Sequence, residues 1–152
     1  MTTTARQPLP ASMRRANRLV TPLLRLGVPI GPMYLLTVRG RRTGVPRTTP
    51  VATFTFEGGR YVMQAMPAAG WVANVRAAGR GILGRGPRRP RVSLVEVPVA
   101  ERPPLLRHAG SMAPAGLRRQ FFEVGLIESP DPESFPAAAA RIAVFRVENE
   151  ER

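Results

Sequence analysis

The stretch Tyr34–Pro50 most constrains the fold, because it combines two strand-like segments with a turn rich in glycine and arginine. The apolar run Met33–Val38 precedes Gly40 and Gly44, two residues that let the backbone turn tightly and expose its N–H groups. A second segment, Thr48–Phe56, then alternates in polarity. The pattern predicts a β-hairpin with arginines in its turn. Guanidinium groups suit phosphate and carboxylate, so we expect a small anionic ligand there.

The remaining periodicity predicts further strands, joined by short turns and flanked by helices. A hairpin turn is expected at Glu57–Gly59, and strands over Arg60–Met66, Gly81–Arg85, Arg91–Val97 and Ile142–Glu148. Helices are expected over Met13–Leu26, Trp71–Ala78, Glu101–Met112 and Ala115–Val124, and loops over Gly27–Pro32, Pro67–Gly70, Gly86–Pro90 and Ser129–Pro136. This pattern predicts an α+β fold, a small antiparallel barrel of six to seven strands with an N-terminal helix and flanking helices, because closure hides the sheet edges.

The 152 residues suit a single domain, which we expect over residues 11–152 after a disordered tail at residues 1–10. Residues 11–27 are expected to form an amphipathic helix capped by Ser12. Its apolar stripe suits packing on the core, while its arginines alternatively suit a lid or peripheral contact with a membrane. Pro22 and Pro29 argue against a membrane-spanning helix, and the sequence has no signal-peptide pattern.

Positive charge is concentrated in the N-terminal part of the chain. Residues 1–91 hold 16 arginines and a single acid, Glu57, whereas residues 92–152 hold 7 arginines and 9 acids. The first part therefore carries +15 and the second −2, which implies that the first part faces a negative partner. The absence of cysteine excludes thiol chemistry and fits a cytoplasmic protein.

Few residues could serve acid–base or metal chemistry. The single histidine, His108, argues against a histidine-based metal site, and Glu57 is the only carboxylate in the half that carries the arginine turn. We expect no metal and no catalytic side chain. Hydride transfer by a bound cofactor fits this composition, because the cofactor carries the difficult step.

Two other segments carry chemical signals. In Met66–Arg76, small residues after a strand would let a flat ring approach the backbone, and Trp71 could pack on that ring or fill the core. Asn74 is expected to anchor the turn between the strand and the helix. The cluster Arg85–Arg91 is interpreted as a solvated turn, and it lacks the interleaved aromatic residues that would favour nucleic acid as its ligand.

These segments resemble the deazaflavin-dependent nitroreductase family, also called the flavin/deazaflavin oxidoreductase superfamily. The family motif G-R-[RK]-[ST]-G-x-P-R-x-[ST]-P is matched by Gly40, Arg41, Arg42, Thr43, Gly44, Pro46, Arg47, Thr49 and Pro50. A second motif, W-x-x-N-[LV]-R-A, is matched by Trp71, Asn74, Val75, Arg76 and Ala77. The resemblance covers roughly residues 13–97. It implies a split β-barrel that binds coenzyme F420, an 8-hydroxy-5-deazaflavin with a phospholactyl-oligoglutamate tail.

The resemblance implies a set of cofactor-binding residues. Those expected at or beside the acidic tail are Arg41, Arg42, Thr43, Gly44, Arg47, Thr48, Thr49 and Pro50. Those expected around the ring are Ala65, Met66, Pro67, Ala68, Gly70, Trp71, Val72 and Asn74. Tyr34, Phe121 and Phe122 are expected to contact the substrate. Members that reduce nitroaromatics use tyrosines in the C-terminal helical region, where this chain has the two phenylalanines.

The expected reaction is hydride transfer from reduced F420 to a small, apolar, electron-poor acceptor such as a quinone, an enone or a nitro compound. FMN is the alternative cofactor. The alternative function is a non-catalytic carrier of a fatty acid or another anionic lipid on the same barrel. A monomer or a homodimer is expected, in the cytoplasm or peripheral to the inner face of the membrane, and no specific nucleic acid is expected as a partner.

Overall fold

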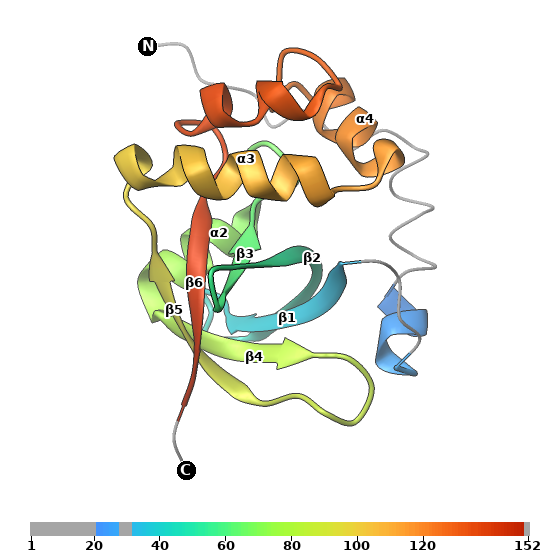
Figure 1. Cartoon of the computed structure of the whole chain (residues 1–152). Coiled ribbons are helices and arrows are strands. Elements are labelled where there is room, and N and C mark those ends of the chain that lie inside the picture. Colours follow the sequence, from blue (N-terminus) through green and yellow to red (C-terminus); the bar gives the residue numbers. More distant parts are fainter. Residues whose placement is uncertain (1–20, 28–31, 151–152) are drawn as a thin grey trace.

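The computed structural model describes residues 21–27 and 32–150. Six antiparallel strands form a closed barrel in the order β1–β2–β3–β6–β5–β4 (Figure 1). The strands are β1 (Met33–Arg39), β2 (Pro46–Phe56), β3 (Gly59–Met63), β4 (Arg80–Gly84), β5 (Arg91–Glu96) and β6 (Val144–Asn149). The barrel closes because β1 pairs with both β2 and β4. The predicted α+β barrel is therefore confirmed, with six strands.

Helices flank the barrel. They are α2 (Gly70–Ala78), α3 (Arg102–Met112) and α4 (Ala115–Glu123), with short 3₁₀ helices η1 (Val99–Glu101), η2 (Pro132–Ser134) and η3 (Pro136–Ala138). Figure 1 shows α3 and α4 above the barrel and the C-terminal end of β6 below it. No helix within the described residues is long and apolar enough to cross a membrane.

Residues 21–25 are helical, which agrees with the end of the predicted N-terminal helix. The predictions for the tail at residues 1–10, for helix residues 11–20 and for linker residues 28–31 lie outside the described residues. Leu24 in the described part is fully buried, whereas Leu26 is 78% exposed.

Two apolar clusters stabilise the fold. The inner cluster fills the barrel with residues such as Leu36, Val51 and Phe145, and α2 adds Val72 and Val75 to it. The outer cluster joins the barrel wall to the helical layer, with large buried side chains at Leu106, Phe121, Phe135 and Ile142. Because Val72 and Val75 belong to the inner cluster, α2 is packed directly against the barrel core. This packing fixes the positions of the other side chains on α2 relative to the barrel.

Some boundaries differ from the prediction. β3 ends at Met63 rather than at Met66, because beyond it the buried side chain of Gln64 replaces one ladder hydrogen bond, while the Gln64 backbone N–H still donates to the Ala143 carbonyl. The side-chain amide nitrogen of Gln64 donates to the Met66 carbonyl at 2.7 Å, and its amide oxygen accepts from the Ala143 N–H at 3.1 Å. β6 begins at Val144, two residues late. The predicted loop over residues 129–136 contains η2, which has a proline in its first turn.

Candidate functional site

The β1–β2 turn is an ordered loop. The Gly40 N–H donates to the Val45 carbonyl at 2.9 Å, and the Gly44 N–H donates to the Gly40 carbonyl at 2.9 Å. Gly44 has φ +74, a conformation that favours glycine, and the Val45 N–H also donates to the Thr43 hydroxyl at 3.3 Å. The turn therefore holds its conformation through its own backbone, and the arginine side chains are not needed to build it.

Asn74 on α2 connects this turn to the helix. Its side-chain oxygen accepts from the Arg41 backbone N–H at 3.1 Å and from Arg41 Nη1 at 2.9 Å. Arg41 Nη1 also lies 3.5 Å from the Gly70 carbonyl oxygen, at the start of the helix. Asn74 is only 7% exposed, so this link is largely protected from water. The prediction that Asn74 anchors the turn before its own helix was wrong, because its carboxamide instead holds a turn 33 residues away.

The loop between β3 and α2 is also held in place from beneath. Gln64 fixes the Met66 carbonyl, as described above, and Ala68 adopts φ +53. A left-handed conformation costs a residue with a side chain about 1–2 kcal/mol, so the surrounding contacts must impose it. Such strain is found most often at ligand-binding sites. Gln64 was not predicted as a functional residue, and its only signal was a polar side chain at the end of an apolar strand.

The structure brings together the predicted tail-binding arginines and the N-terminal end of α2, but it separates the two threonines. Arg41, Arg42 and Arg47 are all exposed. The Thr48 hydroxyl is occupied by Thr37 at 2.7 Å, and Thr49 lies on the opposite face of β2, because successive strand residues alternate. A ligand at one face of the strand therefore meets only one of the two hydroxyls.

Trp71 fills part of the core, which is one of the two roles that the sequence left open, and its packing on a ligand ring stays a prediction. It packs against the inner cluster, and its ring lies 5.7 Å from the Phe145 ring between centroids. It remains partly exposed at the first turn of α2. Ala69 caps this helix without a side-chain hydrogen bond, and its first turn has no acidic residue. The start of α2 thus presents an indole edge and free backbone N–H groups beside the arginine turn.

The predicted substrate-contacting residues lie apart from this turn. Phe121 is fully buried, with its ring 5.3 Å from that of Phe135, while Phe122 is 43% exposed on the same helix. Tyr34 lies at the beginning of β1, whereas the arginine turn follows the end of that strand. The structure does not bring these three residues to the turn, and their contact with an acceptor stays a prediction.

A charged network connects α2 to the helical layer. Glu96 on β5 accepts two hydrogen bonds from Arg76 on α2, at 2.9 and 2.7 Å, and a third from Arg102 on α3 at 3.0 Å. Hydrogen bonding to Arg76, and the charges of Arg76 and Arg102, hold the pKa of Glu96 below its ordinary value, although burial opposes the shift. Burial lowers the pKa of Arg102, which still remains charged at neutral pH.

We expect acid to weaken the fold through Glu96. Since its pKa is lower in the folded protein, its contribution is present above the unfolded pKa of about 4.3 and is lost as the pH falls through the folded value. The free energy of unfolding, measured by urea titration between about pH 6 and pH 3, should fall more steeply for the wild type than for Glu96→Gln. Parallel pH profiles for the two proteins would contradict this role.

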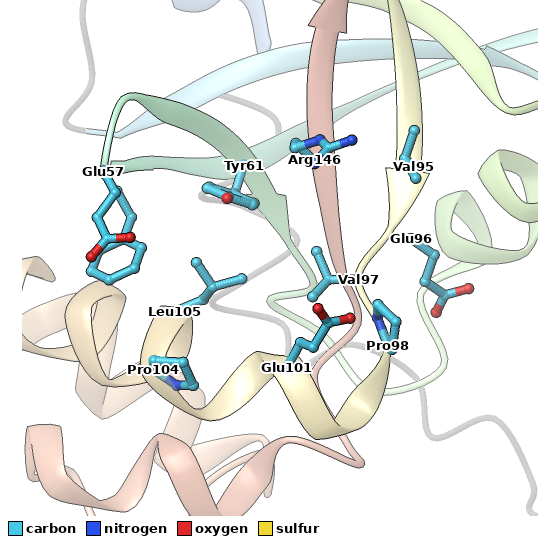
Figure 2. A pocket seen from close by; sticks show the side chains of 11 residues that line it. Glu57, Tyr61, Val95, Glu96, Val97, Pro98, Glu101, Pro104, Leu105 and Arg146 are labelled. Atoms are coloured by element: carbon cyan, nitrogen blue, oxygen red, sulfur yellow. The ribbon is translucent and has the colours of Figure 1, made fainter.

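A cavity of about 420 Å³ lies elsewhere, on the outer face of the barrel beside the start of α3 (Figure 2). Its lining includes Glu57, Glu101 and Arg146, Glu96 with its carboxylate bound to Arg76 and Arg102, and the apolar residues Val97 and Leu105. A single lining arginine with acidic neighbours does not favour a polyanionic ligand. None of the residues predicted to bind the cofactor lines this cavity, so the exposed arginine turn remains the candidate for an anionic ligand.

The closed antiparallel barrel with flanking helices is consistent with the split β-barrel class of proteins. Residues 12–122 match the family model of F420H(2)-dependent quinone reductases, so the chain belongs to this family. It is an F420-dependent reductase, and coenzyme F420 is its cofactor. The predicted enzyme is thereby confirmed, which favours a reductase over a lipid carrier.

Solved structures are similar to this chain at low sequence identity, and the fold is shared with the first one named here. A pyridoxamine 5'-phosphate oxidase-related, FMN-binding protein from Nostoc punctiforme is 15% identical, with 93% of this chain and 82% of that chain covered and a TM-score of 0.54. A structure described as the F420-H2 dependent reductase FDR-A is 20% identical, with 77% and 94% covered and a TM-score of 0.46. Comparison with curated protein sequences gives no match.

Proposed function

We propose that this protein reduces a small, apolar quinone with reduced F420, and that the β1–β2 turn holds the acidic tail of the cofactor. The observation that carries this proposal is the hydrogen bonding of Arg41 to Asn74, because it places a permanently charged turn against the helix that carries Trp71. A cofactor with an anionic tail and a flat ring requires these two surfaces side by side.

The donor set of the turn suits the tail. Arg42 and Arg47 are exposed, and no described carboxylate forms an ion pair with either of them or with Arg41. Arg47 and Thr49 share one face of β2, so a guanidinium and a hydroxyl would contact the same anion. Forked guanidinium groups bind phosphate and carboxylate oxygens in pairs, which favours a ligand that carries both.

We assign the deazaflavin ring of the cofactor to the β3–α2 loop and the first turn of α2. Met66, Pro67 and Ala68 form a loop that Gln64 holds rigid, and Gly70 leaves the backbone open because no atom lies within 4 Å of where its Cβ would be. Trp71 borders this surface and would exclude water from one edge of the ring. These residues bind and orient the ring.

Reduced F420 supplies a hydride when it is bound, so the protein itself need provide no electron donor. The carboxylates nearest in sequence to this site are those of Glu57 and Glu96. Glu57 lies in the β2–β3 hairpin turn, and Glu96 forms an ion pair with Arg76. Neither of them is placed to move a proton at the turn. The role of the protein is therefore to hold the reduced cofactor and the acceptor in contact. We infer that the acceptor takes its proton from water.

The quinone is the acceptor that the family description favours, and enones and nitro compounds are the alternatives to compare. Turnover of a short-chain quinone, an enone and a nitroaromatic, followed by the absorbance of F420, ranks these classes. Activity confined to the nitroaromatic would contradict the proposal. The dimer, the cytoplasmic location and the membrane contact stay predictions.

Replacing Arg47 with alanine should weaken F420 binding by about 1.5–3 kcal/mol, which is the contribution of a charge-assisted hydrogen bond. This corresponds to a dissociation constant raised roughly 10- to 150-fold, measured by calorimetric titration with oxidised F420. Arg107→Ala is the matched control, because it removes the same charge from an exposed position on α3. Equal affinities of Arg47→Ala and the control would exclude our assignment of the tail.

A further inference from the structure

Two arginines contact one aromatic ring at the end of the barrel where β1 begins. The guanidinium carbon of Arg85, which follows β4, lies 3.9 Å from the centre of the Tyr34 ring. The guanidinium carbon of Arg60, on β3, lies 4.6 Å from the same centre. Tyr34 packs against the inner cluster, and all three residues are partly buried. The interpretation of Arg85 as part of a solvated turn was therefore wrong.

These arginines lack polar partners within residues 21–27 and 32–150. Arg85 Nη1 is buried without a hydrogen-bond partner, although buried polar atoms are almost always paired. The described ion pairs involve Arg76, Arg102 and Arg146, and hence neither Arg60 nor Arg85. The contact with Tyr34 accounts for the position of each guanidinium but leaves its hydrogen-bonding groups unused.

The contacts with the ring do not satisfy the hydrogen-bonding capacity of either guanidinium. A cation–π contact uses the positive charge of the guanidinium over the ring and forms no hydrogen bond from its N–H groups. Both guanidinium carbons lie near one ring, so they are less than about 9 Å apart, within the Debye length of about 10 Å at 0.1 M salt. Their mutual repulsion is therefore only partly screened, and an anion held by both would remove it.

We propose that Arg60 and Arg85, arranged around Tyr34, form a binding site for a phosphate group. A phosphate monoester carries about −1.5 to −2 charges at pH 7, which matches two guanidinium groups. Its several oxygens can accept from both forks at once, whereas a carboxylate has only two oxygens. The phosphate could belong to a free metabolite or to a lipid headgroup.

This site is separate from the turn assigned to the cofactor tail. Tyr34 lies at the beginning of β1 and Arg41 lies beyond its end, and seven residues of extended chain span roughly 20 Å. The site also uses none of the residues of the β1–β2 turn. The inference therefore goes beyond the proposed function and does not depend on it.

The test is a calorimetric titration of the full chain with inorganic phosphate at low ionic strength. We expect saturable binding in the wild type that is at least tenfold weaker in Arg60→Gln and in Arg85→Gln. Arg88→Gln is the matched control, because Arg88 is an exposed arginine on the same hairpin, and its affinity should stay within twofold of the wild type. Phosphate bound at the β1–β2 turn would be unaffected by all three changes.

No saturable binding in the wild type, equal affinity in Arg85→Gln, or an equal loss in Arg88→Gln would overturn the proposal. Arg85→Lys keeps the charge but removes the fork, so it provides a folded variant for the same titration if the glutamine variants do not fold. Its affinity should also fall, and an unchanged value would contradict a forked contact. Acetate should bind at least tenfold more weakly than phosphate, and equal binding would contradict a phosphate site.

Sedimentation with vesicles then identifies the source of the phosphate. Loss of binding to vesicles that contain phosphatidic acid, a phosphate monoester, in Arg85→Gln, with competition by inorganic phosphate, would support the site with a lipid headgroup as its ligand. Equal sedimentation of wild type and variant, together with the calorimetric difference, would support the site with a free phosphate compound.

Discussion

Replacing Arg102 with leucine should lower the free energy of unfolding by about 3–5 kcal/mol, the usual cost of removing one partner from a buried charged network. Arg102 is 4% exposed, and its guanidinium donates to the carbonyls of Val97, Ala139 and Ile142 as well as to Glu96. Leucine would leave these carbonyls without a donor in a site that water reaches poorly. Urea unfolding of the purified variant measures the loss.

Arg107→Leu provides the comparison for this experiment. It makes the same chemical change on the same helix, but Arg107 is exposed, so the expected effect is within about 0.5 kcal/mol. A loss below about 1 kcal/mol in Arg102→Leu would mean that the network contributes no more than an exposed ion pair.

Replacing Asn74 with leucine should weaken both the fold and the binding of F420. The change removes the acceptor of two hydrogen bonds, one of them to a charged group, so we expect a loss of about 2–4 kcal/mol in unfolding free energy. The β1–β2 turn would no longer be fixed to α2. The dissociation constant of F420 should then rise at least tenfold, since the tail and ring surfaces would no longer be pre-positioned.

A double-mutant cycle distinguishes this mechanism from a general loss of packing. Arg41→Ala removes the side-chain donor to Asn74 and keeps the backbone N–H donor, whereas Asn74→Ala removes the shared acceptor. Neighbouring residues that interact show coupling of about 0.5–3 kcal/mol, so the cycle measures the contact of the Arg41 side chain. We expect coupling in both unfolding and F420 affinity. Additive effects within about 0.3 kcal/mol would show that Asn74 does not act through Arg41.

The sequence predicted the local elements well, because their signals are local. The turn at Glu57–Gly59 is an example, since both of its central residues, Glu57 at φ 48 and Gly58 at φ 79, adopt the left-handed backbone of a type I′ hairpin turn. The six strands were recognised from alternation, and closure of the barrel followed from the need to pair every edge. The end of β3 and the beginning of β6 were predicted wrongly, because the Gln64 side chain accepts the Ala143 N–H in place of a ladder carbonyl.

The site was predicted less completely, because its key contacts join distant parts of the chain. The motif identified Arg41 and Asn74 but not that they bind each other across 33 residues. Arg102 looked like an ordinary residue at a helix start, and Arg85 like one of several arginines in a turn. Their partners lie far away in the sequence, so only the folded structure shows that one is a buried donor to Ala139 and the other lies on Tyr34.

The closed order of strands also affects how copies of this protein can meet. Every described strand has a hydrogen-bonded neighbour on both sides, so a second molecule finds no row of free backbone groups to extend. Association must therefore use side-chain surfaces as long as the barrel is intact. The pairings of β4 with β1 and with β5 each join only three residue pairs, and the opening of either would expose two edges at once, so aggregation on heating should begin at β4.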